Sequence, residues 1–263
     1  KRKDRPWLLF IMALIWIGGA TFFHSPWEPY EPYVVAVVKS IIQTNKWLVP
    51  YISSNAPYLE LQPFYFWIYA LIIKIFNFTD IVNAIRVINS VLIFAVIYIF
   101  GKIGSGLSAY KNGRSVVMIL ISSIGFINNA YQLSPNLIIL LGFVLYFFAL
   151  QRSNKTPGIS GGLLALGLIL ISINFTAEFI IIALLLLGIL PLVSKSWRNS
   201  EYVLTVFAGI GIFALIFISY AWQLNSYDHH FYLEWKEKYM DIASVEPSQI
   251  LPNLLFYFQT LLW

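Results

Sequence analysis

Carboxylates and aromatic side chains gather in one segment, residues 24–67, which is rich in Trp, Tyr and Pro. Its carboxylates are Glu28, Glu31 and Glu60. Positioned carboxylates are common general acids and bases, so the segment is either an active site or the remains of one. Cations that could attract a phosphate group lie within or near it, at Lys39, Lys46 and Arg86. Their alternative role is to position the chain in a lipid headgroup layer.

Metal and thiol chemistry find little support in the sequence. The chain has no Cys, so it has neither a disulfide framework nor a thiolate metal site. Its three His residues are scattered and lack metal-ligand spacing. We therefore predict no metal site and no redox chemistry.

The composition indicates an integral membrane protein. Hydrophobic residues make up 59% of the 263 residues and charged residues only 11%, and the mean hydropathy is +0.74. A water-soluble globule of this composition would expose very large apolar surfaces. The net charge of +5 comes from short Lys and Arg clusters between apolar runs, which membrane topology and anionic lipid explain. We therefore expect the lipid bilayer, and not nucleic acid, as the partner of these charges.

The apolar runs predict an all-α protein with about eight membrane crossings in a single domain, residues 1–263. A crossing needs about 20 apolar residues, and about 17 suffice when interfacial residues help. The predicted crossings are residues 7–23, 84–101, 115–130, 134–150, 159–174, 175–193, 203–222 and a last one from about residue 250. The chain lacks an initial Met and ends within an apolar run, so we expect it to be part of a longer polypeptide.

The basic loops set the orientation. If residues 63–78 cross as well, the basic loops at 102–114, 151–158 and 194–201 fall outside, against the positive-inside rule. We therefore predict that residues 63–78 form an interfacial helix, the alternative being a short spanning helix. The N-terminus is then cytoplasmic, and the external segments are residues 24–83 and 223–249. We expect the membrane itself to be a bacterial inner membrane. Within the first, residues 33–44 place Val34, Val37, Val38, Ile41 and Ile42 on one face of an amphipathic helix.

The aromatic segment resembles the first external loop of the ArnT-like family, polyprenyl-phosphate-sugar glycosyltransferases of the GT-C superfamily related to protein O-mannosyltransferases. That loop reads approximately P-W-x-P-D-E-P-Y, then G-D-W-x-V-P, then P-Y-x-E-K-P-P-L-x-Y-W. The matching residues, in register without a gap, are Pro26, Trp27, Pro29, Glu31, Pro32, Tyr33, Trp47, Val49, Pro50, Pro57, Tyr58, Glu60, Pro63 and Trp67. Weaker echoes, at Arg86, at Ser134 to Asn136 and at Trp263, extend the resemblance along nearly the whole chain, and a carboxy-terminal portion of such a protein would be missing.

The resemblance implies transfer of a sugar from a polyprenyl-phosphate carrier to an acceptor at the outer membrane face. Residue by residue, it implies Glu31 as acid/base and a substrate or lipid site at Tyr58, Glu60, Arg86, Trp67 and Asn136. No cofactor is implied beyond the polyprenyl-phosphate sugar donor. The partners expected are the polyprenyl-phosphate lipid and, in a complex, other membrane proteins.

The charges of the family pattern are largely absent. Tyr30 stands in place of its Asp, Leu61 in place of its Lys, and Gln62 in place of its Pro; Asn136 replaces another Asp, and Ile173 lies at or near a second Lys. A phenol with a reference pKa near 10 is a poor general base at neutral pH, and Leu cannot neutralise a phosphate.

Two functions remain open from the sequence, with a third less favoured. The first is a working transferase that relies on Glu31. The second is a degenerate homologue that acts as a non-catalytic subunit or scaffold of a membrane complex. A transporter is less favoured, because the predicted crossings lack paired ionisable residues near their centres.

Overall fold

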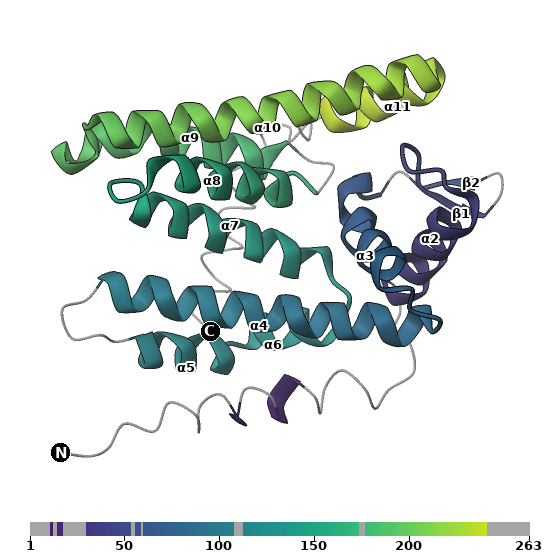
Figure 1. Cartoon of the computed structure of the whole chain (residues 1–263), viewed down its shortest axis with the longest axis horizontal. Coiled ribbons are helices and arrows are strands. Elements are labelled where there is room, and N and C mark those ends of the chain that lie inside the picture. The colour runs from purple at the N-terminus through teal and green to yellow at the C-terminus, as the bar shows by residue number, and fades with distance from the viewer. Residues whose placement is uncertain are drawn as a thin grey trace, which may run out of the picture.

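The computed structural model describes residues 11–12, 15–17, 30–53, 56–58, 60–107, 113–173 and 177–240. This part of the chain is helical apart from one two-stranded antiparallel sheet, formed by β1 (Tyr51–Ser53) and β2 (Ala56–Pro57) (Figure 1). The helices are α2 (Tyr30–Thr44), α3 (Pro63–Phe76), α4 (Ile81–Leu107), α5 (Gly113–Ser122), α6 (Ile124–Tyr131), α7 (Pro135–Arg152), α8 (Pro157–Ile171), α9 (Glu178–Val193), the 3-10 helix η1 (Lys195–Trp197), α10 (Ser200–Tyr227) and α11 (His229–Met240). The all-α prediction is thus confirmed for this part.

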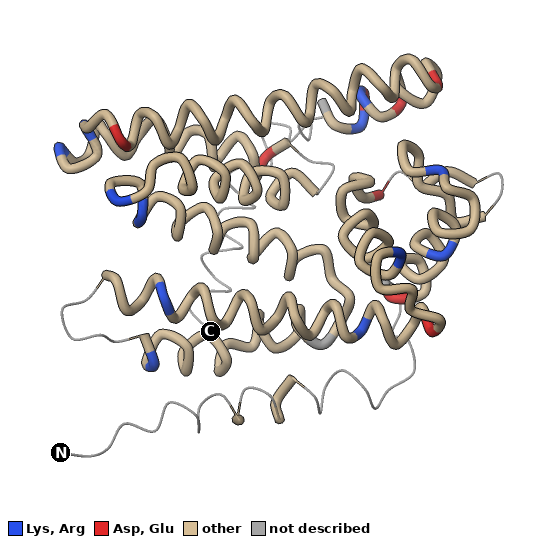
Figure 2. The backbone as a smooth tube through the Cα atoms, viewed as in Figure 1, with Lys and Arg blue, Asp and Glu red and all other residues tan. Residues whose placement is uncertain are grey.

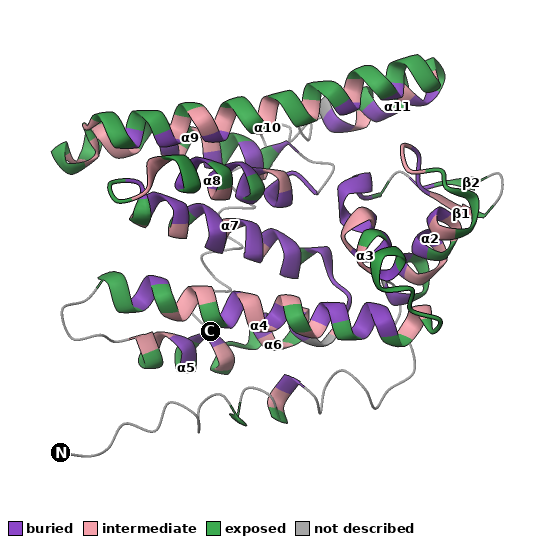
Figure 3. Ribbon diagram, in the orientation of Figure 1, coloured by how far each residue is buried: buried purple, intermediate pink, exposed green. Residues whose placement is uncertain are grey.

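A bundle of long helices forms the body of the molecule. Helices α4, α7, α8 and α10 run along its long axis, with α7 packed between α4 and α8, and α8 packed against α10 (Figure 1). Helix α7 lies inside the bundle and is largely buried, whereas α10 exposes most of its surface (Figure 3). The exposed face of α10 is apolar and includes Phe207, Leu215, Ile218 and Trp222, as expected for a helix face that meets lipid.

Two glycines allow α7 and α8 to pack closely. A Cβ on Gly142 would lie 2.9 Å from the carbonyl oxygen of Gly167 and 2.9 Å from the backbone nitrogen of Ile171. In the same way, a Cβ on Gly167 would lie 2.9 Å from the carbonyl oxygen of Gly142. Small residues at such crossings let two membrane helices approach until their backbones touch.

Helices α2 and α3 lie at one end of the bundle with the small sheet, and they do not follow its long axis (Figure 1). The predicted amphipathic face of residues 33–44 is confirmed, because Val34, Val37, Val38 and Ile41 are buried and only Ile42 is partly so. Both helices end at an asparagine with a left-handed backbone, Asn45 and Asn77. Asn tolerates this conformation better than most residues and so favours a helix end.

Within the described ranges, three helices are long and apolar enough to cross a membrane: α4, α7 and α10. Helices α5 and α6 together make a fourth candidate, but they are bent by 71° at Ser123, so the single helix predicted for residues 115–130 is broken. The backbone of Ser123 is extended, and its hydroxyl accepts a hydrogen bond from the Phe126 N–H, so that it caps α6. Helices α3, α8 and α9 are apolar but shorter. The predicted crossings at residues 7–23 and from about 250 lie wholly or mainly outside the described residues.

Basic residues gather at one end of the bundle. The three basic loops predicted from the sequence follow or join the ends of α4, α7, α9 and α10 that point away from α2, α3 and the sheet (Figure 2). Together, residues 102–114, 151–158 and 194–201 contain seven Lys and Arg and one carboxylate, Glu201. We call this the basic end; acidic and basic residues are mixed at the other end (Figure 2).

Candidate functional site

A buried ion pair joins the aromatic segment, residues 24–67, to the helix bundle. Glu31, in the first turn of α2, lies 3.6 Å from Arg86 of α4, measured from Oε2 to Nη2. Their side chains are only 4% and 9% exposed. The N-terminal position of Glu31 in α2 also favours its negative charge. A carboxylate already neutralised by a guanidinium and shielded from solvent is well suited to hold α2 against α4.

Buried tyrosines of α3 continue this polar cluster toward α7. Tyr65 donates a hydrogen bond of 2.9 Å to the carbonyl oxygen of Leu133, and Tyr69 donates one of 3.5 Å to Oδ1 of Asn89. Burial raises the pKa of Tyr65 well above its usual value, and Tyr69, Tyr58 and Glu31 raise it further. Tyr65 therefore stays protonated at neutral pH, where it donates hydrogen bonds and cannot serve as a base.

Buried side chains without charge stand at the two positions where the resemblance would place cations, Leu61 and Ile173, and at the neighbouring position of its Pro, Gln62. Leu61 is buried, and Gln62 and Ile173 are completely so. These positions lie close together in space, because Gln62, which follows Leu61, donates a 3.0 Å hydrogen bond from its backbone N–H to the Ile173 carbonyl oxygen. A phosphate placed there would meet a packed apolar wall, not a cation, from these residues.

Helix α11 covers Gln62 from the other side. The indole N–H of Trp235 donates a 2.9 Å hydrogen bond to Oε1 of Gln62, and Trp235 is itself buried. Nε2 of Gln62 has no hydrogen-bond partner within the described part of the chain. Trp235 also stacks on Tyr239 and contacts Tyr220 at right-angled geometry, so α11 closes this region with aromatic rings.

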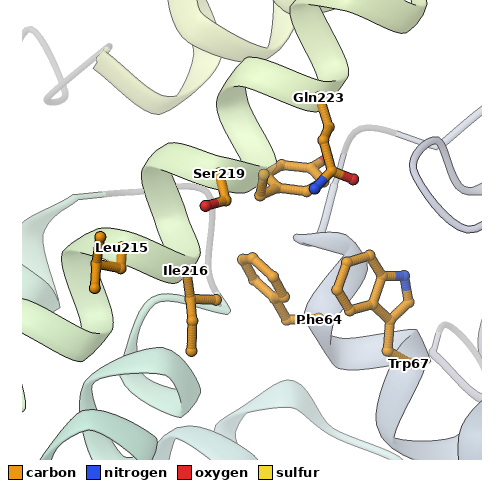
Figure 4. A pocket seen from close by; sticks show the side chains of 7 residues that line it. Phe64, Trp67, Leu215, Ile216, Ser219 and Gln223 are labelled. Carbon is orange, nitrogen blue, oxygen red and sulfur yellow. The ribbon is translucent and has the colours of Figure 1, made fainter.

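An aromatic groove of about 290 Å³ opens beside the cluster, between α3 and α10. Phe64 and Trp67 of α3 face the side chains of Leu215, Ile216, Ser219 and Gln223 of α10 (Figure 4), and Tyr220 of α10 also lines the groove. Two hydrogen bonds to the preceding loop fix its walls: Trp67 donates to the Trp47 carbonyl oxygen at 2.7 Å, and Tyr220 to that of Leu48 at 3.1 Å. The lining is mainly apolar, and Ser219 and Gln223 add polar side chains to the α10 wall, a combination that suits an amphiphilic ligand.

The residues expected from the sequence to form one site separate into three places. Glu31, Arg86 and Tyr58 belong to the buried cluster, where Tyr58 packs edge-on against Phe66 and influences Tyr65. Trp67 lines the groove.

The other two lie apart at the surface. The carboxylate of Glu60 is 70% exposed and pairs with Lys238 at 3.0 Å, and Asn136 is exposed and donates to Oδ1 of Asn129. Tyr30 begins α2, but its side chain is outside the described part.

Sequence reasoning missed the two tyrosines and the contact between Trp235 and Gln62. Tyr65 and Tyr69 are four residues apart on one helix, and Arg86 and Asn89 are three apart on the next, so each pair shares a helix face. This spacing was the available signal. The Trp235–Gln62 hydrogen bond joins α11 to the start of α3, and no local pattern predicts such a distant contact.

Comparisons of the chain with protein-family models, with curated proteins and with solved structures give no match.

Proposed function

We propose that the chain is a degenerate relative of the ArnT-like membrane glycosyltransferases, which serves as a non-catalytic, lipid-binding subunit of a membrane complex. The observation that carries this proposal is the buried Glu31–Arg86 pair, in which the carboxylate at the motif position that the resemblance assigns to the acid/base is already paired with a guanidinium. The buried Leu61 and Ile173 support it, because they cannot stabilise a departing phosphate.

The aromatic groove is the place we assign to the lipid. An isoprenoid chain is apolar and fits beside Phe64, Leu215 and Ile216, while Ser219 and Gln223 can donate hydrogen bonds to its phosphate end. The ligand class is a polyprenyl phosphate. The partner is a second membrane protein that contributes what this chain lacks.

The membrane arrangement we propose has about eight crossings in a GT-C-like bundle, with α2 and α3 lying along the outer interface. The basic end is cytoplasmic, as the positive-inside rule requires, and the N-terminus is cytoplasmic in a bacterial inner membrane. The gathering of the three basic loops at the end opposite α2 and α3 supports this orientation.

Single-cysteine labelling in intact cells tests this orientation, since the chain has no Cys of its own. Gln43→Cys and Asn154→Cys place thiols at exposed positions at opposite ends of the bundle. A membrane-impermeant maleimide is expected to label position 43 in intact cells and position 154 only after permeabilisation. The reverse pattern would overturn the proposed orientation.

The second candidate function is a working transferase with Glu31 as acid/base. The observation in its favour is that Glu31 keeps the place of the acidic residue that follows the family's Asp, close to an arginine and several tyrosines. In this candidate, Glu31 must exchange a proton with the acceptor.

A double substitution separates the two functions. Glu31→Leu with Arg86→Met removes both charges and leaves apolar side chains of similar size, a change that buried ion pairs often tolerate. We expect the double variant to reach the membrane in normal amount, to bind undecaprenyl phosphate as the native chain does, and to keep the cellular phenotype that the native gene supports. For a transferase, losing the acid/base would lower the rate by about a hundredfold to ten-thousandfold.

The readouts are binding of undecaprenyl phosphate to purified protein and complementation of a gene deletion, both at matched protein level.

Trp67→Ala is the companion variant, since it removes a wall of the groove without touching the ion pair. It is expected to weaken lipid binding. If the double variant complements the gene deletion at least a hundredfold less well than the native gene, while protein level and lipid binding are unchanged, the transferase replaces the scaffold as the conclusion.

A further inference from the structure

A second cavity lies at the basic end, away from the aromatic groove. It has a volume of about 560 Å³ and lies between α4, α7, α9 and η1. This is within the range of about 300–1,000 Å³ that small-molecule sites occupy. The lining is apolar apart from Gln151 and includes three phenylalanines, Phe100, Phe143 and Phe147.

The cavity has the shape that a lipid chain needs. Its wall on α7 runs from Leu140 to Gln151, which is about 16 Å along the helix axis. It therefore follows the direction in which a lipid chain lies in the bilayer. Phe147 is 48% exposed and Leu107 is 77% exposed, so the cavity opens on a side of the bundle where apolar side chains meet the surroundings.

Positive charge lies where this cavity reaches the end of the bundle. Trp197 lines the cavity and is flanked in sequence by Lys195 and Arg198, both exposed. Arg198 is held beside α9 by a hydrogen bond from Nε to the Pro191 carbonyl oxygen, one residue beyond the lining residue Leu190. Tryptophan between basic residues at a helix end is typical of the lipid headgroup level.

We propose that this cavity binds one anionic phospholipid from the leaflet at the basic end. An acyl chain lies along Phe100, Phe143 and Phe147, and the phosphate lies near Lys195 and Arg198. Basic pockets between membrane helices bind the headgroups of anionic lipids by the same combination of apolar burial and charge. The site does not depend on the proposed function, because it lies at the other end of the bundle and needs only that the bundle is in a membrane.

The test measures lipid binding to the full-length chain in mild detergent by native mass spectrometry. The probes are phosphatidylglycerol and phosphatidylcholine with identical acyl chains. We expect phosphatidylglycerol to bind about tenfold or more tightly, because each Lys or Arg near the headgroup attracts its charge. Equal binding of the two lipids would overturn the proposal.

Two variants locate the lipid. Lys195→Gln with Arg198→Gln is expected to weaken phosphatidylglycerol binding by about tenfold or more and to leave phosphatidylcholine unchanged. Lys46→Gln with Lys236→Gln is the matched control, because it removes the same charge from the other end of the molecule. Should the control weaken binding equally, the attraction is a general effect of net charge and the proposed site is wrong.

Gly106→Leu adds a large side chain to the lining of the cavity and tests the chain-binding part of the proposal. A Cβ at Gly106 would meet the amide end of the Gln151 side chain, which must give up its 3.0 Å hydrogen bond to the Ile103 carbonyl oxygen in order to move aside. A flexible side chain can make this move at the small net cost of one hydrogen bond, so the fold is expected to survive. Binding of phosphatidylglycerol should fall, while the thermal unfolding temperature of the lipid-free protein should fall only slightly. Unchanged binding would show that the lipid does not enter this cavity.

Discussion

Arg86→Met is expected to destabilise the folded protein by about 3–5 kcal/mol, because it leaves the carboxylate of Glu31 buried without its counter-charge. The Arg86 and Glu31 side chains are 9% and 4% exposed, so solvent offers the remaining charge little compensation. The measurement is equilibrium unfolding in detergent micelles, followed by tryptophan fluorescence.

The control for this loss of stability is a substitution that removes an exposed charge from α2, the helix that carries Glu31. Lys39→Met changes an exposed lysine of α2, and its effect is expected to stay within about 0.5 kcal/mol. Adding Glu31→Leu to Arg86→Met should recover most of the lost stability, since both charges are then absent. If Arg86→Met costs less than about 1 kcal/mol, the pair is not the buried anchor we describe.

Gly142→Leu is expected to destabilise the bundle by about 3 kcal/mol, at the upper end of what overpacking usually costs. Its Cβ would lie 2.9 Å from two backbone atoms of α8, and backbone atoms within a helix cannot move aside as a side chain can. Helices α7 and α8 must therefore separate, which exposes the best-buried helix of the described bundle. The same unfolding measurement applies.

Gly162→Leu is the matched control on α8. A Cβ there meets nothing within 4 Å, and the position is exposed. Its effect is expected to be small or slightly stabilising, because glycine weakens a helix by roughly 0.5–1 kcal/mol relative to alanine. Equal losses for the two variants would show that the glycines matter for reasons other than the α7–α8 crossing.

Local patterns predicted the helices well. Residues 33–44 lie within α2, residues 63–76 of the predicted 63–78 form α3, and residues 203–222 lie within α10. A helical repeat of apolar residues indicates the buried face of a helix, and Pro or Asn indicates a helix end. Each of these signals lies within about one helical turn of the feature that it predicts. The break at Ser123 escaped prediction because serine occurs inside many helices, and its capping role depends on how α5 and α6 pack.

The candidate site was less predictable. The sequence indicated Glu31 and Arg86 separately, but their pairing depends on how α2 lies across the start of α4, which no local spacing determines. It also grouped Glu60 and Asn136 with them, whereas both lie at the surface with other partners. The sequence therefore identified charged and polar residues that could form a site, but the tertiary packing determines which of these residues lie in contact.

The length of α10 has a consequence for how the protein responds to membrane thickness. Its 28 residues extend about 42 Å, whereas the hydrocarbon layer is about 30 Å thick. In the membrane arrangement that we propose, in which α10 crosses the bilayer, the helix must tilt or project about 12 Å into the headgroup region and beyond. Because Trp235 ties α11 to the start of α3, the far end of α10 is not free to follow a change in tilt. A thicker or thinner bilayer therefore places its strain on the junction at Asp228, where α10 ends and α11 turns back.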